Sequence, residues 1–333
     1  MYDVVLLTLG AGRDAPSACG DGCCGGGGAG GAKPAEECAD TPRVPVLACA
    51  DVLTAAGARV TTVTARADAE IDEVLARLDG PPRPDGLTWP DSDGKTRLVV
   101  ATASDGQLRA VVRRLVRRYA PPPSRRPADL AGNRTLPDLP PIGVLPLDPR
   151  GGVGSATDLA GQLGLPRDPA EVAWAVLGGP VRRLDLLRND GGSVTLDGAL
   201  IGGADDTGTP RTWQGRVEVD DAVLSDGDEP LLACVVGNGN GYAEVEGLPL
   251  LTGADPADGV VEVAVVLPVV ARTWRRRKMR LEVRRGRGRA ASINPRADRV
   301  PYLDDGVSGD LTRKRSWWIE PGAWAVYDRA PAS

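Results

Sequence analysis

Three glycine-containing turns in this 333-residue chain have the composition of phosphate-binding turns. They are Gly10–Gly12, Ser104–Gln107 and Gly151–Asp158, and each follows a short apolar run. Glycine lets the backbone approach phosphate oxygens closely, and the free N–H groups at the start of a helix point at the anion. One such turn is common for purely steric reasons. Three at the carboxyl ends of strands in one sheet favour a nucleotide-binding edge.

The chain contains no histidine, which excludes several catalytic classes. Ser-His-Asp and Cys-His catalysis, histidine-ligated zinc and a histidine general base all need that side chain. Acid–base chemistry near neutral pH must then fall to carboxylates, Lys, Tyr or Cys. The net charge of −5 also argues against wholesale binding to nucleic acid, so any basic surface must be local.

Apolar runs and amphipathic segments alternate through the N-terminal half of the chain. In one segment Ile71, Val74, Leu75 and Leu78 recur at the spacing of one helical face. Such alternation implies a mainly parallel sheet with helices on both faces, a Rossmann-like three-layer α/β domain. The predicted elements, in chain order, are strand 4–7, helix 46–56, strand 59–64, helix 71–78, strand 98–101, helix 108–119, strand 142–147, a helix that the capping box 155–158 opens and that runs through 163, and helix 169–178.

The pattern then changes, because short strand-like pieces recur between turns and helical periodicity becomes scarce. This is typical of an antiparallel β domain, and we expect a β-sandwich. We therefore divide the chain into an α/β domain over residues 1–180, a β-sandwich domain over 181–316 and a C-terminal segment, 317–333, that returns to the first domain. Residues 14–43, rich in glycine, and 120–141, rich in proline and arginine, are predicted to be flexible insertions.

Residues 98–115 (LVVATASDGQLRAVVRRL) resemble the strand, Gly-Gly-Asp-Gly-Thr loop and helix of the diacylglycerol kinase catalytic domain family, which includes bacterial lipid kinases and sphingosine kinases. Residues 142–166 resemble the family's second signature, in which a strand leads to a Gly-Thr-Gly-Asn-Asp turn and a helix. Further similarities follow in the family's order at 235–242 (VVGNGNGY), 254–266 (ADPADGVVEVAVV) and 303–306 (LDDG). The resemblance thus spans most of the chain.

The resemblance implies an ATP-dependent lipid kinase that transfers the γ-phosphate to the hydroxyl of diacylglycerol or a related lipid. The first domain would bind ATP and Mg²⁺, and the second domain would bind the lipid. By position, Asp305 would take the proton from the lipid hydroxyl, although Asp304 beside it could do so instead. Asp258 is a candidate ligand of a structural magnesium ion, or simply a turn aspartate. The residues expected around the nucleotide phosphates are Gly10, Gly12, Asp105, Gly106, Gln107, Gly154, Ser155, Thr157 and Asp158.

Two other hypotheses stay open, because parts of the family's motifs are replaced. Ala103-Ser104 stands where the family's loop has two glycines, Gln107 stands for its threonine, and Val307 stands for the glutamate of its Asp-Gly-Glu motif. Added Cβ atoms restrict positive φ angles and crowd an incoming phosphate. These departures favour a homologue that binds nucleotide or lipid without turnover. An NAD-kinase-like enzyme is a further alternative, which the Leu-Gly-Leu-Pro segment at 163–166 argues against.

A basic segment near the C-terminus, residues 272–289, carries ten basic residues and one acidic residue. It is either a solvated strand pair or a patch for an anionic membrane surface, where Trp274 would suit the interface. We favour the membrane, because a lipid kinase meets its substrate there. No apolar stretch is long enough to span a bilayer and the N-terminus does not resemble a signal peptide, so we expect a cytoplasmic protein associated peripherally with membranes. Nucleic acid is not expected as a partner, and a homodimer stays open.

Overall fold

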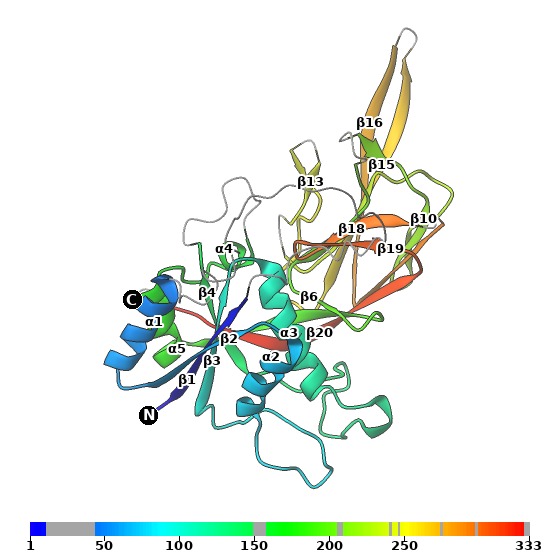
Figure 1. Ribbon diagram of the computed structural model, residues 1–333. Helices are drawn as coiled ribbons and strands as arrows, with labels where there is room; N and C mark the ends of the chain where they lie inside the picture. Colours follow the sequence, from blue (N-terminus) through cyan, green and yellow to red (C-terminus); the bar gives the residue numbers. More distant parts are fainter. Residues whose placement is uncertain are drawn as a thin grey trace, which may run out of the picture.

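The computed structural model describes residues 1–10, 44–148, 158–204, 209–239, 242–245, 247–273, 276–296 and 299–329. Strands and helices alternate in the N-terminal half, and the described elements that follow are strands (Figure 1). The first group is β1 (Asp3–Leu9), α1 (Val44–Ala55), β2 (Arg59–Ala65), α2 (Asp68–Leu75), η2 (Ala76–Leu78), β3 (Thr96–Thr102), α3 (Asp105–Tyr119), η3 (Pro123–Arg125), β4 (Pro141–Pro146), α4 (Leu159–Gln162) and α5 (Pro169–Gly178). The second group is β5 (Val181–Asn189), β6 (Val194–Thr195), β7 (Gly198–Ile201), β8 (Gly203–Ala204), β9 (Pro210–Arg211), β10 (Gly215–Val219), β11 (Ala222–Asp226), β12 (Ala233–Gly237), β13 (Glu244–Val245), β14 (Leu248–Pro249), β15 (Val261–Thr273), β16 (Arg276–Gly288), β17 (Ala290–Pro295), β18 (Val300–Asp304), β19 (Val307–Leu311) and β20 (Arg315–Tyr327).

Strands β2, β1, β3 and β4 lie side by side in that order and are all parallel. Successive residues of β1 point to opposite faces of the sheet, so Val5 and Leu7 pack with α2 and α3, while Val4 and Leu6 pack with α1 and α5. The helices therefore cover both faces of this sheet (Figure 1). Within the described ranges, no helix is both long and apolar enough to cross a bilayer.

The parallel sheet continues into the C-terminal strands, because β20 joins both parts. Residues 325–326 of β20 pair in parallel with residues 141–142 of β4, and β20 also pairs antiparallel with β5. A register shift between Glu320 and Trp324 separates the two halves of β20. The first half pairs with β17, which brings β10 and β11 into the same sheet. One ten-stranded sheet therefore underlies both halves of the chain.

A second sheet of six strands, in the order β16-β15-β12-β7-β18-β19, packs against the C-terminal part of the first. Apolar side chains of both sheets form a common core between them, with Val217, Ile293 and Trp317 from the first and Val263 and Val265 from the second. All five are fully buried, so the two sheets are held together by the removal of this apolar surface from water. The molecule is thus mixed α/β, with two large sheets and few helices.

Residues 120–141 pack against the core, contrary to the flexible insertion that their composition predicts. The side chains of Leu136 and Leu139 are fully buried. The N–H of Thr135 donates to a carboxylate of β20 (2.7 Å), and the N–H of Leu139 donates to a carbonyl of β20 (2.8 Å). The prolines and arginines that dominate the composition conceal these few apolar anchors. The other predicted insertion, 14–43, lies outside the described residues.

Candidate functional site

The predicted phosphate turns that the structure describes lie at the carboxyl ends of the parallel strands. Gly10 follows β1, and its N–H donates to the carbonyl of Ala65 at the end of β2 (2.9 Å). Helix α3 begins at Asp105 after β3, and α4 begins at Leu159. The carboxylate of Asp105 accepts a hydrogen bond from the N–H of Leu159 (3.1 Å), so the two helix starts are in contact. Four other predicted residues lie outside the described part of the chain: Gly12, Gly154, Ser155 and Thr157.

The turn between β3 and α3 is closed by its own side chains. Gln107 Oε1 accepts a hydrogen bond from the N–H of Ala103 (2.9 Å), and Thr102 Oγ1 accepts one from the N–H of Ser104 (3.1 Å). These side chains occupy backbone donors that a glycine turn would leave for a phosphate. A phosphate can use these two N–H groups only after Gln107 and Thr102 have moved. Gly106 is buried in the first turn of the helix.

Asp158 and Asp105 differ in what their carboxylates contact. Asp158 Oδ1 caps α4 by accepting a hydrogen bond from a backbone N–H of that helix (2.9 Å), and it is paired with Arg167. Burial raises the pKa of Asp105 to about 6, against the opposing hydrogen bond from the start of α4, and the charges of Asp305 and Asp158 add to the rise. The carboxyl group of Asp105 therefore loses its proton at a pH close to neutral, about 6.

Asp305, the predicted base, lies in the turn between β18 and β19 and is only 2% exposed. Its φ of 48° is in the left-handed region. Oδ2 accepts a hydrogen bond from the N–H of Leu196 (2.8 Å), and Oδ1 accepts those of Asp197 (2.9 Å) and Gly198 (3.2 Å). Burial raises the pKa of Asp305, while the Arg109 charge and these three N–H groups oppose the rise. As arranged, both oxygens of Asp305 hold backbone rather than face an incoming hydroxyl.

Asp304, the alternative base, is 1% exposed and is also held by partners within the protein. Thr195 Oγ1 donates to its Oδ1 (2.8 Å), and Arg109 pairs with its Oδ2. Burial, followed by the charge of Asp305, raises the pKa of Asp304 to about 7, and Arg109 opposes the rise. The two aspartates are therefore buried and hold neighbouring groups of the protein in place, in addition to being the predicted candidates for the catalytic base.

Arg109 neutralises part of this charge and connects α3 to the C-terminal strands. Its side chain is 11% exposed, and its Nε lies 3.7 Å from Oδ2 of Asp305. It also donates to the carbonyl of Val194 (2.7 Å) and to Ser193 Oγ (2.8 Å). The sequence groups Arg109 with the other arginines on the polar face of α3. The signal that could have distinguished it is the Asp-Asp pair, since buried carboxylates need a nearby cation.

Asp197 completes the group of buried carboxyl groups and is absent from the sequence-based candidates. It is 3% exposed, and its Oδ2 accepts a hydrogen bond from Gln162 Nε2 (2.8 Å). Burial raises the pKa of Asp197 to about 8, with the charges of Asp305 and Asp105 adding to the rise and Gln162 opposing it. In the sequence this residue looks like any turn aspartate, because its burial comes from distant elements.

Stability is expected to fall as the pH rises from about 4 to about 8, because of the carboxyl groups of Asp105, Asp197 and Asp304. The pKa values of Asp105, Asp197 and Asp304 are raised above that of an unfolded aspartate, about 3.9, so the folded state retains protons that the unfolded state releases. Their contribution is complete below the unfolded pKa and is lost as the pH rises through the folded values. Asp197→Asn should remove part of this decline, which thermal unfolding midpoints measured across the range will reveal. Parallel pH profiles for the variant and the wild type would contradict the prediction.

Asp258, the candidate magnesium ligand, is already paired. Its Oδ2 forms an ion pair with Arg287, and its Oδ1 accepts a hydrogen bond from the N–H of Val260 (2.9 Å). The guanidinium occupies the position that a cation would take beside this carboxylate. The described ranges contain no group of three or more Cys, Asp and Glu side chains that could hold a metal ion. As arranged, Asp258 fits the role of a turn aspartate and does not fit that of a magnesium ligand.

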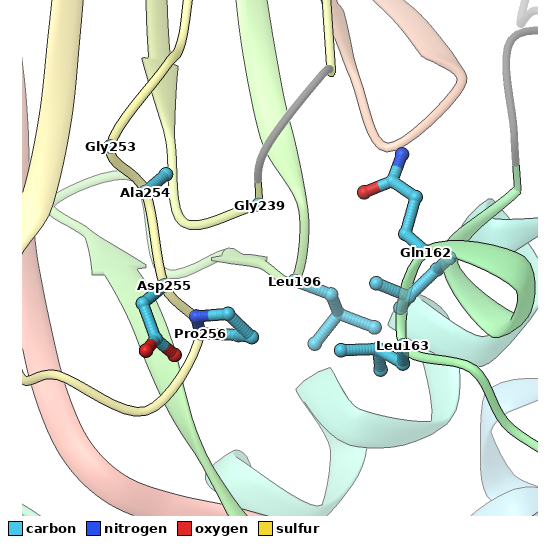
Figure 2. Close-up of a pocket in the computed structure, with 9 residues that line it drawn as sticks. Gln162, Leu163, Leu196, Gly239, Gly253, Ala254, Asp255 and Pro256 are labelled. Carbon is cyan, nitrogen blue, oxygen red and sulfur yellow. The ribbon is translucent and has the colours of Figure 1, made fainter.

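A cavity of about 530 Å³ lies between α4 and the turn at residues 253–256 (Figure 2). Leu163, which follows α4, and Leu196, which follows β6, point toward each other at its base (Figure 2). Ala254 and Pro256 form the opposite wall. The lining residues of α4, together with Leu163, belong to the nucleotide edge, while the other lining residues come from the C-terminal half of the chain. The cavity therefore lies where the two parts of the molecule meet.

No protein-family model matches the sequence, and no curated protein matches it. Solved structures do match in fold. A diacylglycerol kinase from Bacillus anthracis str. Sterne is 13% identical, with 99% of this chain and 98% of that chain covered and a TM-score of 0.56. Two further structures from the same organism, both provisionally named as diacylglycerol kinases, are also 13% identical. The match to the first covers 99% of this chain and 97% of that chain, with a TM-score of 0.60. The match to the second covers 98% of each chain, with a TM-score of 0.59. At this identity the likeness shows the fold alone: the chain shares the fold of these structures over nearly its whole length.

Proposed function

We propose that this protein is an ATP-dependent lipid kinase that phosphorylates the hydroxyl of diacylglycerol or a related lipid. The observation that carries the proposal is the junction between the two parts of the molecule. The starts of α3 and α4, a group of buried carboxyl groups and a partly apolar cavity meet there. Helix starts suit nucleotide phosphates, and leucine walls suit a lipid alcohol. The order of the sequence motifs and the shared fold support the same assignment.

In this proposal the nucleotide lies against Gly10, Asp105 and Gly106, at the carboxyl edge of the parallel sheet. A Cβ at Gly10 would lie 3.1 Å from the side chain of Arg66, so a larger residue there would have to displace that side chain at this edge. Mg²⁺ bound with ATP would neutralise charge on the phosphates, and the described residues contain no group of three or more Cys, Asp and Glu side chains that could hold it on their own. The contribution of the chain itself is to hold the acceptor hydroxyl beside the phosphate and to exclude water, since positioning supplies most of the acceleration in phosphoryl transfer.

Purified protein incubated with ATP, Mg²⁺ and diacylglycerol in mixed micelles is expected to form phosphatidic acid. Gly10→Val, whose side chain would displace Arg66 at the end of β1, should disturb the nucleotide edge and lower the rate by about tenfold or more. Gly178→Ala serves as the control, because a Cβ at this exposed helix end meets nothing within 4 Å. A parallel reaction with NAD as the acceptor tests the NAD-kinase-like alternative. Phosphorylated NAD without phosphorylated lipid would replace the proposal with that alternative.

Two observations favour a second candidate, a homologue that binds nucleotide or lipid without turnover. Gln107 and Thr102 occupy donors of the α3 turn, and both oxygens of Asp305 hold backbone. Both sets of hydrogen bonds are compatible with the fold. They must break before the turn can bind a phosphate and before Asp305 can accept a proton from a hydroxyl. If ATP raises the thermal unfolding midpoint and no phosphorylated product forms, this candidate replaces the kinase. If ATP has no effect on stability and no product forms, both candidates fail.

The membrane contact of such a kinase would lie on the outer part of the β15–β16 hairpin. Strand β12 pairs with β15 only as far as Val266. Beyond that residue, 267–273 and 276–282 pair with each other over seven residue pairs, an arm of about 24 Å at 3.4 Å per residue. The hairpin extends away from the body of the molecule (Figure 1). This arm therefore offers a strand pair to a partner surface.

Charge favours an anionic bilayer as that surface. Six of the nine residues from 272 to 280 are Arg or Lys. The basic residues nearer the body are engaged: Arg284 pairs with Glu229, and Arg287 pairs with Asp258. The proposed membrane contact is therefore the outer arm, residues 267–273 and 276–282, and not the whole basic segment 272–289.

Replacing Arg276, Arg277 and Lys278 together with serine is expected to weaken binding to vesicles that contain phosphatidylglycerol by about 100-fold, at about 1 kcal/mol for each basic residue. Co-sedimentation with the vesicles measures the affinity. The matched control replaces three basic residues that are exposed elsewhere: Arg77, Arg117 and Arg211. Equal losses in the two triple variants would indicate a net-charge effect and contradict the assignment to the arm.

A further inference from the structure

We infer that the cavity beside α4 holds the reacting end of the lipid alcohol, with its free hydroxyl hydrogen-bonded to Oδ1 of Asp197. This inference rests on the proposed lipid substrate. It gives a substrate-binding role to a residue that lies outside every motif of the resemblance.

Asp197 is a buried carboxyl group with an unused oxygen. Its Oδ2 accepts a hydrogen bond from Gln162, but its Oδ1 has no hydrogen-bond partner among the described residues. The residue is 3% exposed, and a buried acceptor without a partner costs about 1–3 kcal/mol. The carboxylates of Asp304 and Asp305, in contrast, are held through both oxygens. Asp197 is therefore the carboxyl group of this cluster that a ligand can complete.

The residue that lies between Oδ1 of Asp197 and the cavity is Gly239, which has no side chain. A Cβ at position 239 would lie 2.0 Å from Oδ1 of Asp197, which is closer than two unbonded atoms of this kind approach. Gly239 and Gln162 both line the cavity (Figure 2). Oδ1 thus lies directly behind a part of the wall that is backbone alone. A small shift of the Gly239 backbone brings a ligand hydroxyl to Oδ1, while Oδ2 keeps its hydrogen bond to the Gln162 amide.

The rest of the cavity suits the glycerol end of a lipid. Leu159, Leu163 and Leu196 supply apolar wall, while the amide of Gln162 marks the polar end. Its volume of about 530 Å³ is within the usual range for small-molecule sites, which enclose most of a ligand in apolar surface and orient it with few polar groups. A hydroxyl at the polar end and alkyl chains along the leucines would use both features.

The protonation of Asp197 makes the contact testable. Burial and the charge of Asp305 raise its pKa to about 8, and Asp105, Tyr242 and the amide of Gln162 also face it. Below that pH the protonated carboxyl group can donate to any ligand oxygen. Above it the carboxylate can only accept, so it bonds to a hydroxyl and repels an ether oxygen.

The experiment compares two base-stable probes on the whole protein: a dioctyl glycerol ether with one free hydroxyl, and its methyl ether. Calorimetry measures their affinities at about pH 6.5 and about pH 9, on either side of the pKa. We expect the alcohol to be preferred by about tenfold at the higher pH and by clearly less at the lower pH. Asp197→Asn should abolish this pH dependence, and Gly239→Ala should abolish the preference. Gly253→Ala, also in the cavity wall, should keep the preference, because its Cβ would meet no atom closer than 3.8 Å.

The outcomes separate this inference from the proposed function. Equal binding of alcohol and ether to the wild type at the higher pH would overturn the inference and leave lipid binding in place. A pH-dependent preference that persists in Asp197→Asn would also overturn it. Failure to bind either probe would overturn the inference together with the lipid substrate. The expected preference in a protein that forms no phosphorylated lipid would support the inference and assign the protein to the non-catalytic binders.

Discussion

Replacing Arg109 with alanine is expected to lower the free energy of unfolding by about 3–5 kcal/mol, the cost of removing one partner from a buried ion pair. The guanidinium pairs with Asp304 and lies 3.7 Å from Asp305. Without it the carboxyl groups of Asp304 and Asp305, whose charges repel each other, stay buried with no cation from α3. The variant also loses the hydrogen bonds to Val194 and Ser193 that connect α3 to the C-terminal strands.

Two further variants isolate this effect. Arg117→Ala removes an exposed arginine from the same helix and is expected to change stability by at most about 0.5 kcal/mol. The double variant Arg109→Met, Asp304→Asn should regain part of the loss, because it removes a buried charge together with its partner. Urea unfolding near neutral pH measures all four proteins. A double variant less stable than Arg109→Ala, or equal losses for Arg109 and Arg117, would show that the pair does not carry the stability.

Replacing Asp305 with alanine is expected to lower the free energy of unfolding by about 3 kcal/mol or more and to abolish any lipid phosphorylation. Its carboxylate is the acceptor for the buried N–H groups of Leu196, Asp197 and Gly198. Each buried donor left without an acceptor costs about 1–3 kcal/mol. The positive φ of 48° adds to the loss, because alanine adopts the left-handed region less readily than aspartate does.

Asp220 provides a matched control, because it shares the conformation but not the burial. Its φ is 47°, and its carboxylate accepts hydrogen bonds from the N–H groups of Arg289 and Ala290, yet it is exposed. Asp220→Ala should therefore cost only about 1 kcal/mol, since water replaces the lost acceptor. Denaturant unfolding of both variants decides the question. An Asp305→Ala protein no less stable than Asp220→Ala would contradict the structural role of Asp305.

Asp305→Asn separates structure from chemistry at the same position. Asparagine tolerates the left-handed region and keeps one acceptor oxygen, so this variant should be more stable than Asp305→Ala. If it folds but forms no phosphatidic acid, Asp305 takes part in the reaction as the resemblance implies. If phosphorylation survives, Asp305 positions the backbone of residues 196–198 and another group accepts the proton.

The secondary structure of the N-terminal half followed from local patterns. The predicted strand 98–101 lies within β3 (Thr96–Thr102), and the predicted helix 108–119 lies within α3 (Asp105–Tyr119). Residues a few positions apart determine these elements, because the spacing of apolar side chains must match one face of a helix or strand. In the C-terminal half the sequence predicts short strands between turns, yet β15 runs over 13 residues to Thr273, because β16 pairs with it beyond the edge of the body.

The sequence alone placed the glycine turns at the carboxyl ends of strands and marked the Asp304–Asp305 pair. The tertiary structure decided what surrounds them. Arg109 and Asp304 are 195 residues apart, and Gln162 and Asp197 are 35 residues apart, so no local pattern connects them. Burial and pKa shifts are sums over all neighbouring elements, and those neighbours become known only when the chain is folded. For the same reason Asp197, a turn aspartate in the sequence, became the carboxyl group with an oxygen left for a ligand.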